Sequence, residues 1–309
     1  MSVLAAAAEQ YLRLRNSLGH DLAEHQRLLP RFVAYLEATD TPTITVAAAL
    51  AWAYEAGVDP ASSNPARRMT IARGFARHMA GIDPDTEIPP PGLIAGHRRW
   101  RPPFIYSPAD IDALLARCRG LHHQLPAATH ETLFGLLAVT GMRISEAIRL
   151  DRRDIDWATG VLMIRESKFQ KSRAVPVLES TMGVLDRYAH TRDHLCPRPC
   201  ASMYFVSMTG TPLIYQIIEQ TFRRLCDSAG IGASADRPPR IHDLRHTFAV
   251  RTLLGWYRAG EDVEARLPIL STYLGHRDPR STYWYLSAAP ELLALAASRL
   301  QDSGQVTSR

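Results

Sequence analysis

The 309-residue sequence predicts a mainly α-helical protein with a small antiparallel β-sheet, divided into two domains. Apolar residues recur at helical spacing through the first hundred residues, as at Leu28, Leu29, Phe32, Val33 and Leu36. The segment DPDTEIPPPGLIAGHRRWRPPF is rich in proline and has no periodicity, which is typical of a linker. A short strand-like interval at 154–177 interrupts an otherwise helical second half. We therefore expect a helical domain at 1–90, a basic linker at 91–106 and a larger domain at 107–309.

In the N-terminal domain we expect helices at the start of the chain, at 22–38 and at 46–56, and a fourth that opens at Ser63-Asn64-Pro65 and stops at Gly81. On a wheel of the fourth helix the apolar residues share one face, and Arg67, Arg73 and Arg77 lie opposite. Such a row of arginines suits contact with phosphates or base edges. A solvated charged face explains the row about equally well.

The basic charge of the chain is unevenly distributed. The net charge is +5 and the pI is near 9.2, which favours an acidic partner such as nucleic acid without establishing one. Residues 1–59 hold four Arg and seven acidic residues, net −3, whereas residues 60–106 hold seven Arg and three acidic residues, net +4. The linker contributes Arg98, Arg99 and Arg101, so we expect it to lie against the same partner.

In the second domain, Ser107-Pro108 predicts the start of a helix, and 161–164 and 174–177 predict two strands joined by a turn. Further helices are expected near 179–192, 213–229, 242–256, 266–274 and 288–301. The predicted turn carries Lys168 and Lys171, the two lysines among 36 basic residues. Their placement is either chance or a need for an amine that can give up a proton, a role that Arg serves poorly.

We expect a cytoplasmic protein. No apolar run approaches the roughly 18 residues that span a bilayer, and the Ala-rich start predicts a helix rather than a signal peptide. Of four cysteines only Cys196 and Cys200 are close, and no second pair follows at zinc-ligand spacing. Reduced thiols are therefore expected.

Four segments carry the residues most suited to chemistry. TGMRISE places Arg143 and Glu146 three residues apart on one helical face, where the carboxylate can hold the guanidinium. SKFQKSR is the lysine hairpin. IHDLRHT opens a helix with His242 and Arg245 near its N-terminus, where backbone N–H groups also favour an anion. YLGH ends a helix at Gly275, and Tyr283 and Tyr285 follow.

These segments, in this order, resemble the successive boxes of the tyrosine recombinase family, which includes phage integrases, Xer recombinases and Cre. The resemblance rests on TGMRISEAIRL, the lysine hairpin, HDLRHTFA, and LGH followed nine residues after its histidine by tyrosine, over roughly 107–290. The N-terminal half matches only in architecture, a core-binding domain that forms a C-shaped DNA clamp with the catalytic domain. The hairpin lacks the glycines that many relatives have on either side of its first lysine.

The resemblance implies a role for each box. Tyr285 would attack the scissile phosphate, while Arg143 and Arg245 would clamp its non-bridging oxygens. Glu146 would support Arg143. Tyr283 lies close enough that composition alone cannot choose between the two tyrosines, and the family spacing selects Tyr285.

Proton transfer falls to the remaining boxes. Lys168 would protonate the departing 5′ oxygen, His242 would assist proton transfer near the tyrosine, and His276 would hydrogen-bond the phosphate. The family needs neither metal nor nucleotide, so no cofactor is expected. The other basic residues singled out would contact DNA: Arg67, Arg73, Arg77, Arg98, Arg99, Arg101, Lys171 and Arg173.

The partner implied is a double-stranded DNA recombination site, with self-association into a synaptic tetramer that passes through a Holliday junction. A terminal helix rich in leucine would pack on the neighbouring protomer, and a companion recombinase is left open; no membrane is involved. Two alternatives remain: a type IB topoisomerase-like nicking-closing enzyme and an inactive DNA-binding accessory protein. The biological role and target site are not readable from the residues.

Overall fold

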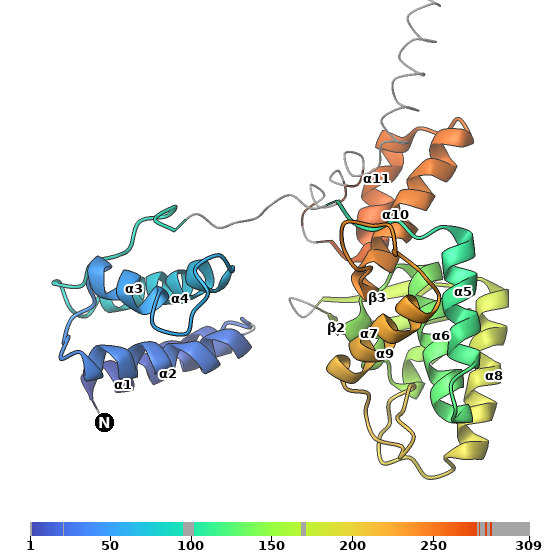
Figure 1. Ribbon diagram of the computed structural model, residues 1–309, viewed down its shortest axis with the longest axis horizontal. Coiled ribbons are helices and arrows are strands. Elements are labelled where there is room, and N and C mark those ends of the chain that lie inside the picture. The colour runs from blue at the N-terminus through green and yellow to red at the C-terminus, as the bar shows by residue number, and fades with distance from the viewer. Residues whose placement is uncertain are drawn as a thin grey trace, which may run out of the picture. The chain divides into compact units, whose positions relative to one another are not determined.

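The computed structural model describes residues 2–20, 22–94, 102–167, 171–276, 278, 282 and 285. The chain forms two compact units, Met1–Arg101 and Pro102–Arg309 (Figure 1). The mainly helical class with one small antiparallel sheet is confirmed. Within the described residues, none of the helices is both long and apolar enough to cross a membrane.

The N-terminal unit is a bundle of helices around an apolar core. Its helices are α1 (Val3–Ser17), α2 (Ala23–Ala38), α3 (Val46–Ala53) and α4 (Asn64–Met79). Helices α1, α2 and α4 each place apolar residues on one face, whereas α3 is apolar throughout, and the apolar side chains of all of them meet in the core. The largest fully buried core side chains include Phe32, Trp52 and Phe75. The expected ends at residue 56 and at Gly81 were too late, since α3 ends at Ala53 and α4 at Met79.

The second unit packs helices around a three-stranded sheet. Its elements, in chain order, are α5 (Pro108–Arg119), α6 (Gln124–Thr140), α7 (Ile144–Ile148), the 3₁₀ turn η1 (Arg152–Asp154), β1 (Ile155–Asp156), β2 (Val161–Ser167), β3 (Lys171–Pro176), α8 (Glu179–Leu195), α9 (Tyr215–Ser228), α10 (Ile241–Arg258) and α11 (Val263–Leu274). The start of α5 is confirmed as a capping box, because Ser107 and Asp110 bond each other's backbone N–H.

The sheet is an antiparallel meander in the order β1-β2-β3. Strand β2 pairs with β3 from Val161 opposite Pro176 to Ser167 opposite Lys171, with an irregularity after Ile164. This confirms the expected hairpin with longer strands, but Lys171, which was expected in the turn, is the first residue of β3 because the strand pairing extends to it. The two-residue strand β1 was not predicted, because so short a segment shows no alternation.

Two apolar clusters hold this unit together. The larger surrounds Phe134 and Phe222 and takes Leu162 and Val175 from the inner face of the sheet. The smaller joins α10 to α11 through side chains that include Leu253, Leu267 and Leu274. It also contains Tyr285, so the C-terminal part of the unit brings this residue against the helix that starts at Ile241.

A glycine at the end of α6 allows a close approach that other residues would block. Gly141 has φ +61°, and a Cβ there would lie 2.5 Å from a ring carbon of Phe248. Gly141→Ala should therefore lower the free energy of unfolding by about 1–3 kcal/mol, from the left-handed backbone and the overlap together.

Gly255→Ala is the matched control, because Gly255 lies inside α10 and a Cβ there meets nothing within 4 Å. It should raise stability by roughly 0.5–1 kcal/mol, since alanine favours the helix. Thermal and denaturant unfolding measure both. Equal effects of the two substitutions would contradict the packing described at Gly141.

Candidate active site

Arg143 is held in place from three directions. It lies at the N-cap of α7, after the turn that Gly141 makes at the end of α6. Its guanidinium donates to Oε1 of Glu146 at 2.7 Å and to the carbonyl of Gly275 at 3.1 Å. Its backbone N–H donates to Oε2 of Glu146 at 2.8 Å. The predicted contact between Arg143 and Glu146 is confirmed, and one carboxylate fixes both the backbone and the side chain of this arginine.

Arg245 projects from α10 toward the same turn. Its guanidinium donates to the carbonyls of Gly141 and Leu274, each at 2.8 Å, and only 2% of the residue is exposed. Burial and the nearby charge of Arg143 lower the pKa of Arg245 to about 10, so it still carries its charge at neutral pH. Arg245 is therefore anchored by main-chain carbonyls, which orient it without neutralising its charge, whereas Arg143 is anchored by one carbonyl and by the carboxylate of Glu146.

The end of α11 is the common attachment point. Gly275 takes a left-handed conformation with φ +68° and ends the helix, as the sequence predicts. The carbonyls of Leu274 and Gly275 then receive Arg245 and Arg143. His276 follows at once, with Nδ1 2.7 Å from the hydroxyl of Thr282. One turn thus carries a histidine and positions both arginines.

Tyr285 lies beside this turn and is 2% exposed. Its ring centroid is 6.0 Å from that of His276, nearly parallel, and 5.5 Å from that of His246. Burial raises the pKa of the Tyr285 phenol, although a hydrogen bond with Arg245 and the Arg245 charge oppose that rise. The phenol is therefore protonated at neutral pH and must lose its proton to act as a nucleophile.

Three histidines surround the arginines and are neutral at pH 7. Burial, assisted by neighbouring positive groups, lowers the pKa of His246 and of His276 to about 3. Loss of hydration and the Arg245 charge lower the pKa of His242 to about 4. His242 remains exposed to solvent, so the charge of Arg245 acts on it alongside a partial loss of hydration. Neutral imidazoles can accept a proton or donate a hydrogen bond.

The site carries an excess of positive charge. Arg143, Arg173 and Arg245 gather near one turn, and among the described residues the carboxylate that contacts two of them is Glu146. We name this set, with His242, His246, His276 and Tyr285, the arginine–histidine cluster. Such a cluster suits a bound anion, which would offset the repulsion between the guanidinium groups.

Arg173 occupies an unexpected place. The sequence suggested a DNA contact, yet its guanidinium forms a two-pronged pair with Glu146 at 2.9 and 2.8 Å and donates from Nε to the carbonyl of Tyr273 at 2.9 Å. Its side chain is 11% exposed. The side-chain contacts of the two lysines of the hairpin are not described: Lys168 lies outside the described residues, and Lys171 is described only as the first residue of β3.

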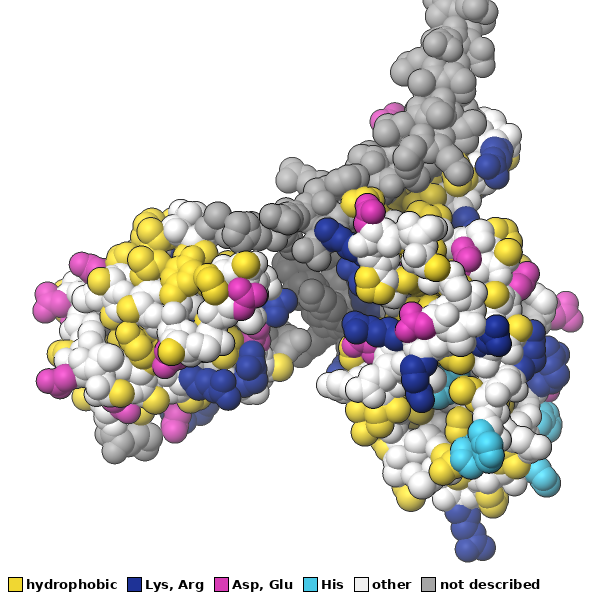
Figure 2. Space-filling model, viewed as in Figure 1, with side chains coloured by type: hydrophobic (Ala, Val, Ile, Leu, Met, Phe, Trp, Pro, Cys, Tyr) yellow, Lys and Arg dark blue, Asp and Glu magenta, His cyan; other side chains and the backbone are white. Residues whose placement is uncertain are grey.

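The arginines of α4 differ from one another. Arg67 and Arg77 are exposed, with Arg67 3.8 Å from Glu24, whereas Arg73 donates to the carbonyls of Pro89 and Pro90 at 2.7 and 2.9 Å. On the visible face of this unit, basic side chains gather near one edge (Figure 2). The linker arginines, Arg98, Arg99 and Arg101, lie outside the described residues. DNA contact by these groups stays a prediction.

Two members of the site were missed from the sequence. His246 lies between His242, at a centroid distance of 4.7 Å, and Tyr285. Its position four residues after His242 places both on one helical face, a signal that could have found it. Thr282 was also missed, because no local pattern pairs it with His276.

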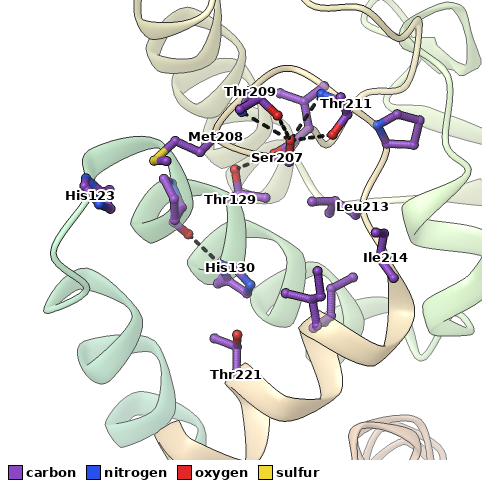
Figure 3. A pocket seen from close by; sticks show the side chains of 15 residues that line it. His123, Thr129, His130, Ser207, Met208, Thr209, Thr211, Leu213, Ile214 and Thr221 are labelled. Atoms are coloured by element: carbon purple, nitrogen blue, oxygen red, sulfur yellow. Dashed lines mark hydrogen bonds between the residues drawn. The ribbon is translucent and has the colours of Figure 1, made fainter.

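A separate recess lies between the start of α6, the 206–214 loop and α9 (Figure 3). Its volume is about 450 Å³, and apolar and hydroxyl side chains line it. His130 on its wall donates through Nδ1 to the carbonyl of Pro126 at 2.7 Å. None of its lining residues belongs to the arginine–histidine cluster, so the recess forms no part of the candidate active site.

Comparison with known proteins identifies the family. Residues 106–291 match the model of the phage integrase family. The integrase/recombinase y4rB of Sinorhizobium fredii is 43% identical over 97% of this chain and 98% of that protein. The tyrosine recombinase XerD of Pseudomonas aeruginosa is 30% identical over 82% of this chain and 77% of that protein.

Solved structures share the fold. The Tn1549 transposon integrase in complex with transposon right end DNA matches with a TM-score of 0.65 and 18% identity, over 96% of this chain and 99% of that one. The XerH site-specific recombinase bound to palindromic difH substrate, in a post-cleavage complex, matches with a TM-score of 0.60 and 20% identity, over 82% of this chain and 70% of that one. The chain therefore belongs to the phage integrase family, the tyrosine-type site-specific recombinases.

Proposed function

We propose that this recombinase is active and cuts and rejoins DNA strands through a covalent bond between Tyr285 and a 3′ phosphate. The observation that carries the proposal is the meeting of Arg143, Arg245 and His276 at one turn beside the buried phenol of Tyr285. Paired guanidinium groups match the charge of a phosphoryl transition state. The phenol of Tyr285 forms a hydrogen bond with one of these guanidinium groups, that of Arg245, and so would lie close to a phosphate bound there.

The proposed step balances without an added cofactor. The phenolic oxygen of Tyr285 bonds to phosphorus while the bond from phosphorus to the 5′ oxygen breaks. The phenolic proton passes to a neutral imidazole. His276 and His246 are candidate acceptors because both contact the ring of Tyr285, and His242 contacts His246 in turn. Lys168 protonates the departing oxygen. Rejoining reverses these steps, and because the phosphotyrosine keeps the energy of the broken bond, no nucleotide is required.

We further propose that the protein acts on a double-stranded recombination site as a tetramer and passes through a Holliday junction. The lambda integrase, which shares this fold, was solved as a dimer bound to a core site. The Tn1549 transposon integrase, which also shares it, was solved in complex with a circular intermediate DNA. Arg67, Arg73, Arg77 and the linker arginines are proposed DNA contacts. The choice among integration, excision, transposition and resolution is left open.

A type IB topoisomerase-like enzyme would use the same chemistry without joining two sites. The similarity to proteins named integrases and recombinases favours exchange between duplexes. An assay with two labelled sites separates them, because only a recombinase yields joined products from both. An inactive accessory protein would form no covalent adduct with DNA.

Tyr285→Phe should abolish the covalent protein–DNA adduct on a suicide substrate, because the attacking oxygen is removed. Binding to the site should persist, since the buried ring remains. Tyr283→Phe is the matched control and should keep the adduct. Gel shift and denaturing gels measure binding and adduct, and peptide mapping locates the bond. A phosphotyrosine at Tyr283 would overturn the assignment, and no adduct in wild type would overturn the activity.

Lys168→Ala should slow cleavage by roughly 10²–10⁴-fold, the usual contribution of a general acid. A 5′-bridging phosphorothiolate should restore the rate, because a thiolate leaves without a proton. Lys171→Ala, in the same hairpin, should cleave the ordinary substrate within a few-fold of wild type. Single-turnover cleavage rates test the assignment. If Lys171→Ala were the slow variant and the phosphorothiolate restored its rate, Lys171 would be the general acid instead.

A further inference from the structure

Arg173 lies at the junction of three elements. It sits on β3, opposite Ile164 of β2, and its side chain reaches both α7 and the end of α11. Two of its nitrogens hold the two oxygens of Glu146, and its Nε holds the carbonyl of Tyr273. This fork uses the planar geometry that distinguishes arginine from lysine. The side chain is therefore committed to protein partners rather than directed at solvent.

The partners of Arg173 are also the supports of the proposed phosphate clamp. Glu146 accepts from Arg173 and, through the same carboxylate, from the backbone and side chain of Arg143. Tyr273 directly precedes Leu274 and Gly275, whose carbonyls hold Arg245 and Arg143. A displacement of Arg173 would thus loosen both the carboxylate beneath Arg143 and the turn that carries His276.

Gly275 shows how tightly this contact is packed. A Cβ on Gly275 would lie 2.8 Å from Nη1 and 3.0 Å from Cζ of Arg173. The guanidinium therefore rests directly against the backbone of the turn. Glycine is required there for this approach as well as for its φ of +68°.

Arg173 also controls the charge of Glu146. Burial alone would raise the pKa of this carboxyl, but the hydrogen bonds and charge of Arg173, with help from Arg143, outweigh it and hold the pKa at about 2. Arg245 on α10 adds a further positive charge that interacts with Glu146. Without Arg173, less positive charge would oppose the effect of burial on the pKa of Glu146, so this carboxyl would protonate at a higher pH than in the wild type.

We propose that Arg173 is a positioning residue, which fixes Arg143 and the 273–276 turn for catalysis and does not contact DNA. The inference rests on the proposed strand-cleavage function. Because β3 directly follows the segment that contains Lys168, Arg173 also ties the strand next to the proposed general acid to the arginines that would hold the phosphate.

The test compares Arg173→Ala, Arg173→Lys and Arg165→Ala. Arg165 is a matched control on neighbouring strand β2, where it pairs with Asp154 and its side chain is 64% exposed. Arg173→Ala should slow single-turnover cleavage by about 10²-fold, as expected when a catalytic group is displaced. Arg173→Lys should recover only part of the rate, because it restores the charge without the fork. Arg165→Ala should cleave like wild type.

Three further readouts separate positioning from DNA contact and from loss of folding. The affinity for the site and its salt dependence should not change in Arg173→Ala, whereas a lost phosphate contact lowers the salt slope by about one. The rate of Arg173→Ala should fall as pH is lowered through a range where wild type is constant, because Glu146 then protonates. Gly275→Ala should impair cleavage less in Arg173→Ala than in wild type, since the clash between the two is gone.

Two results would overturn the inference. One is a reduced salt slope with cleavage unchanged at saturating DNA, which would make Arg173 a DNA contact. The other is a loss of thermal stability with the wild-type rate and pH profile in the folded fraction, which would make it purely structural. Failure of the proposed function looks different, because wild type and Arg165→Ala would then form no adduct either.

Discussion

The active region depends on one buried carboxylate that is shared by two arginines. Glu146 is 7% exposed and accepts hydrogen bonds from the backbone and the side chain of Arg143. Arg173 donates to both oxygens of the same carboxylate. A carboxylate at this depth requires such pairing, because removal of one partner of a buried ion pair costs roughly 3–5 kcal/mol. The pairing in turn joins the sheet, α7 and the end of α11. The positions of the proposed phosphate ligands follow from it.

The charge balance explains why this arrangement suits a phosphate. Arg143, Arg173 and Arg245 bring three positive charges toward the carboxylate of Glu146, and burial, together with the charges of Arg143 and Arg173, lowers the pKa of Arg245. Carbonyl groups of the 274–275 turn and of Gly141 orient the guanidinium groups but neutralise none of them. The neutral histidines avoid further repulsion in the free protein. A phosphate would supply the missing negative charge.

Much of this could be read from the sequence, because local patterns determine it. Periodic apolar residues predicted most helices, Gly275 predicted the end of α11, and the spacing of Arg143 and Glu146 predicted their contact. The sequence predicted that Arg173 contacts DNA, from its place beside Lys171 in the hairpin; the partners that its guanidinium has in the structure lie 27 and 100 residues away, beyond the reach of a local pattern. His246 was overlooked beside two stronger candidates. The contacts of Arg173 with Glu146 and Tyr273, and that of His246 with Tyr285, are tertiary contacts that no local pattern encodes.

The central claim is that the arginine–histidine cluster is arranged to receive an anionic phosphate. The most direct measurement is an NMR pH titration of His242, His246 and His276 in the Tyr285→Phe protein. In the free protein all three should titrate well below the ordinary pKa of 6.5. A duplex with the natural scissile phosphate should raise these pKa values, because a nearby negative charge stabilises the imidazolium, and an uncharged methylphosphonate at that position should raise them less. Titration near 6.5 in the free protein, or equal pKa values with both duplexes, would contradict the account.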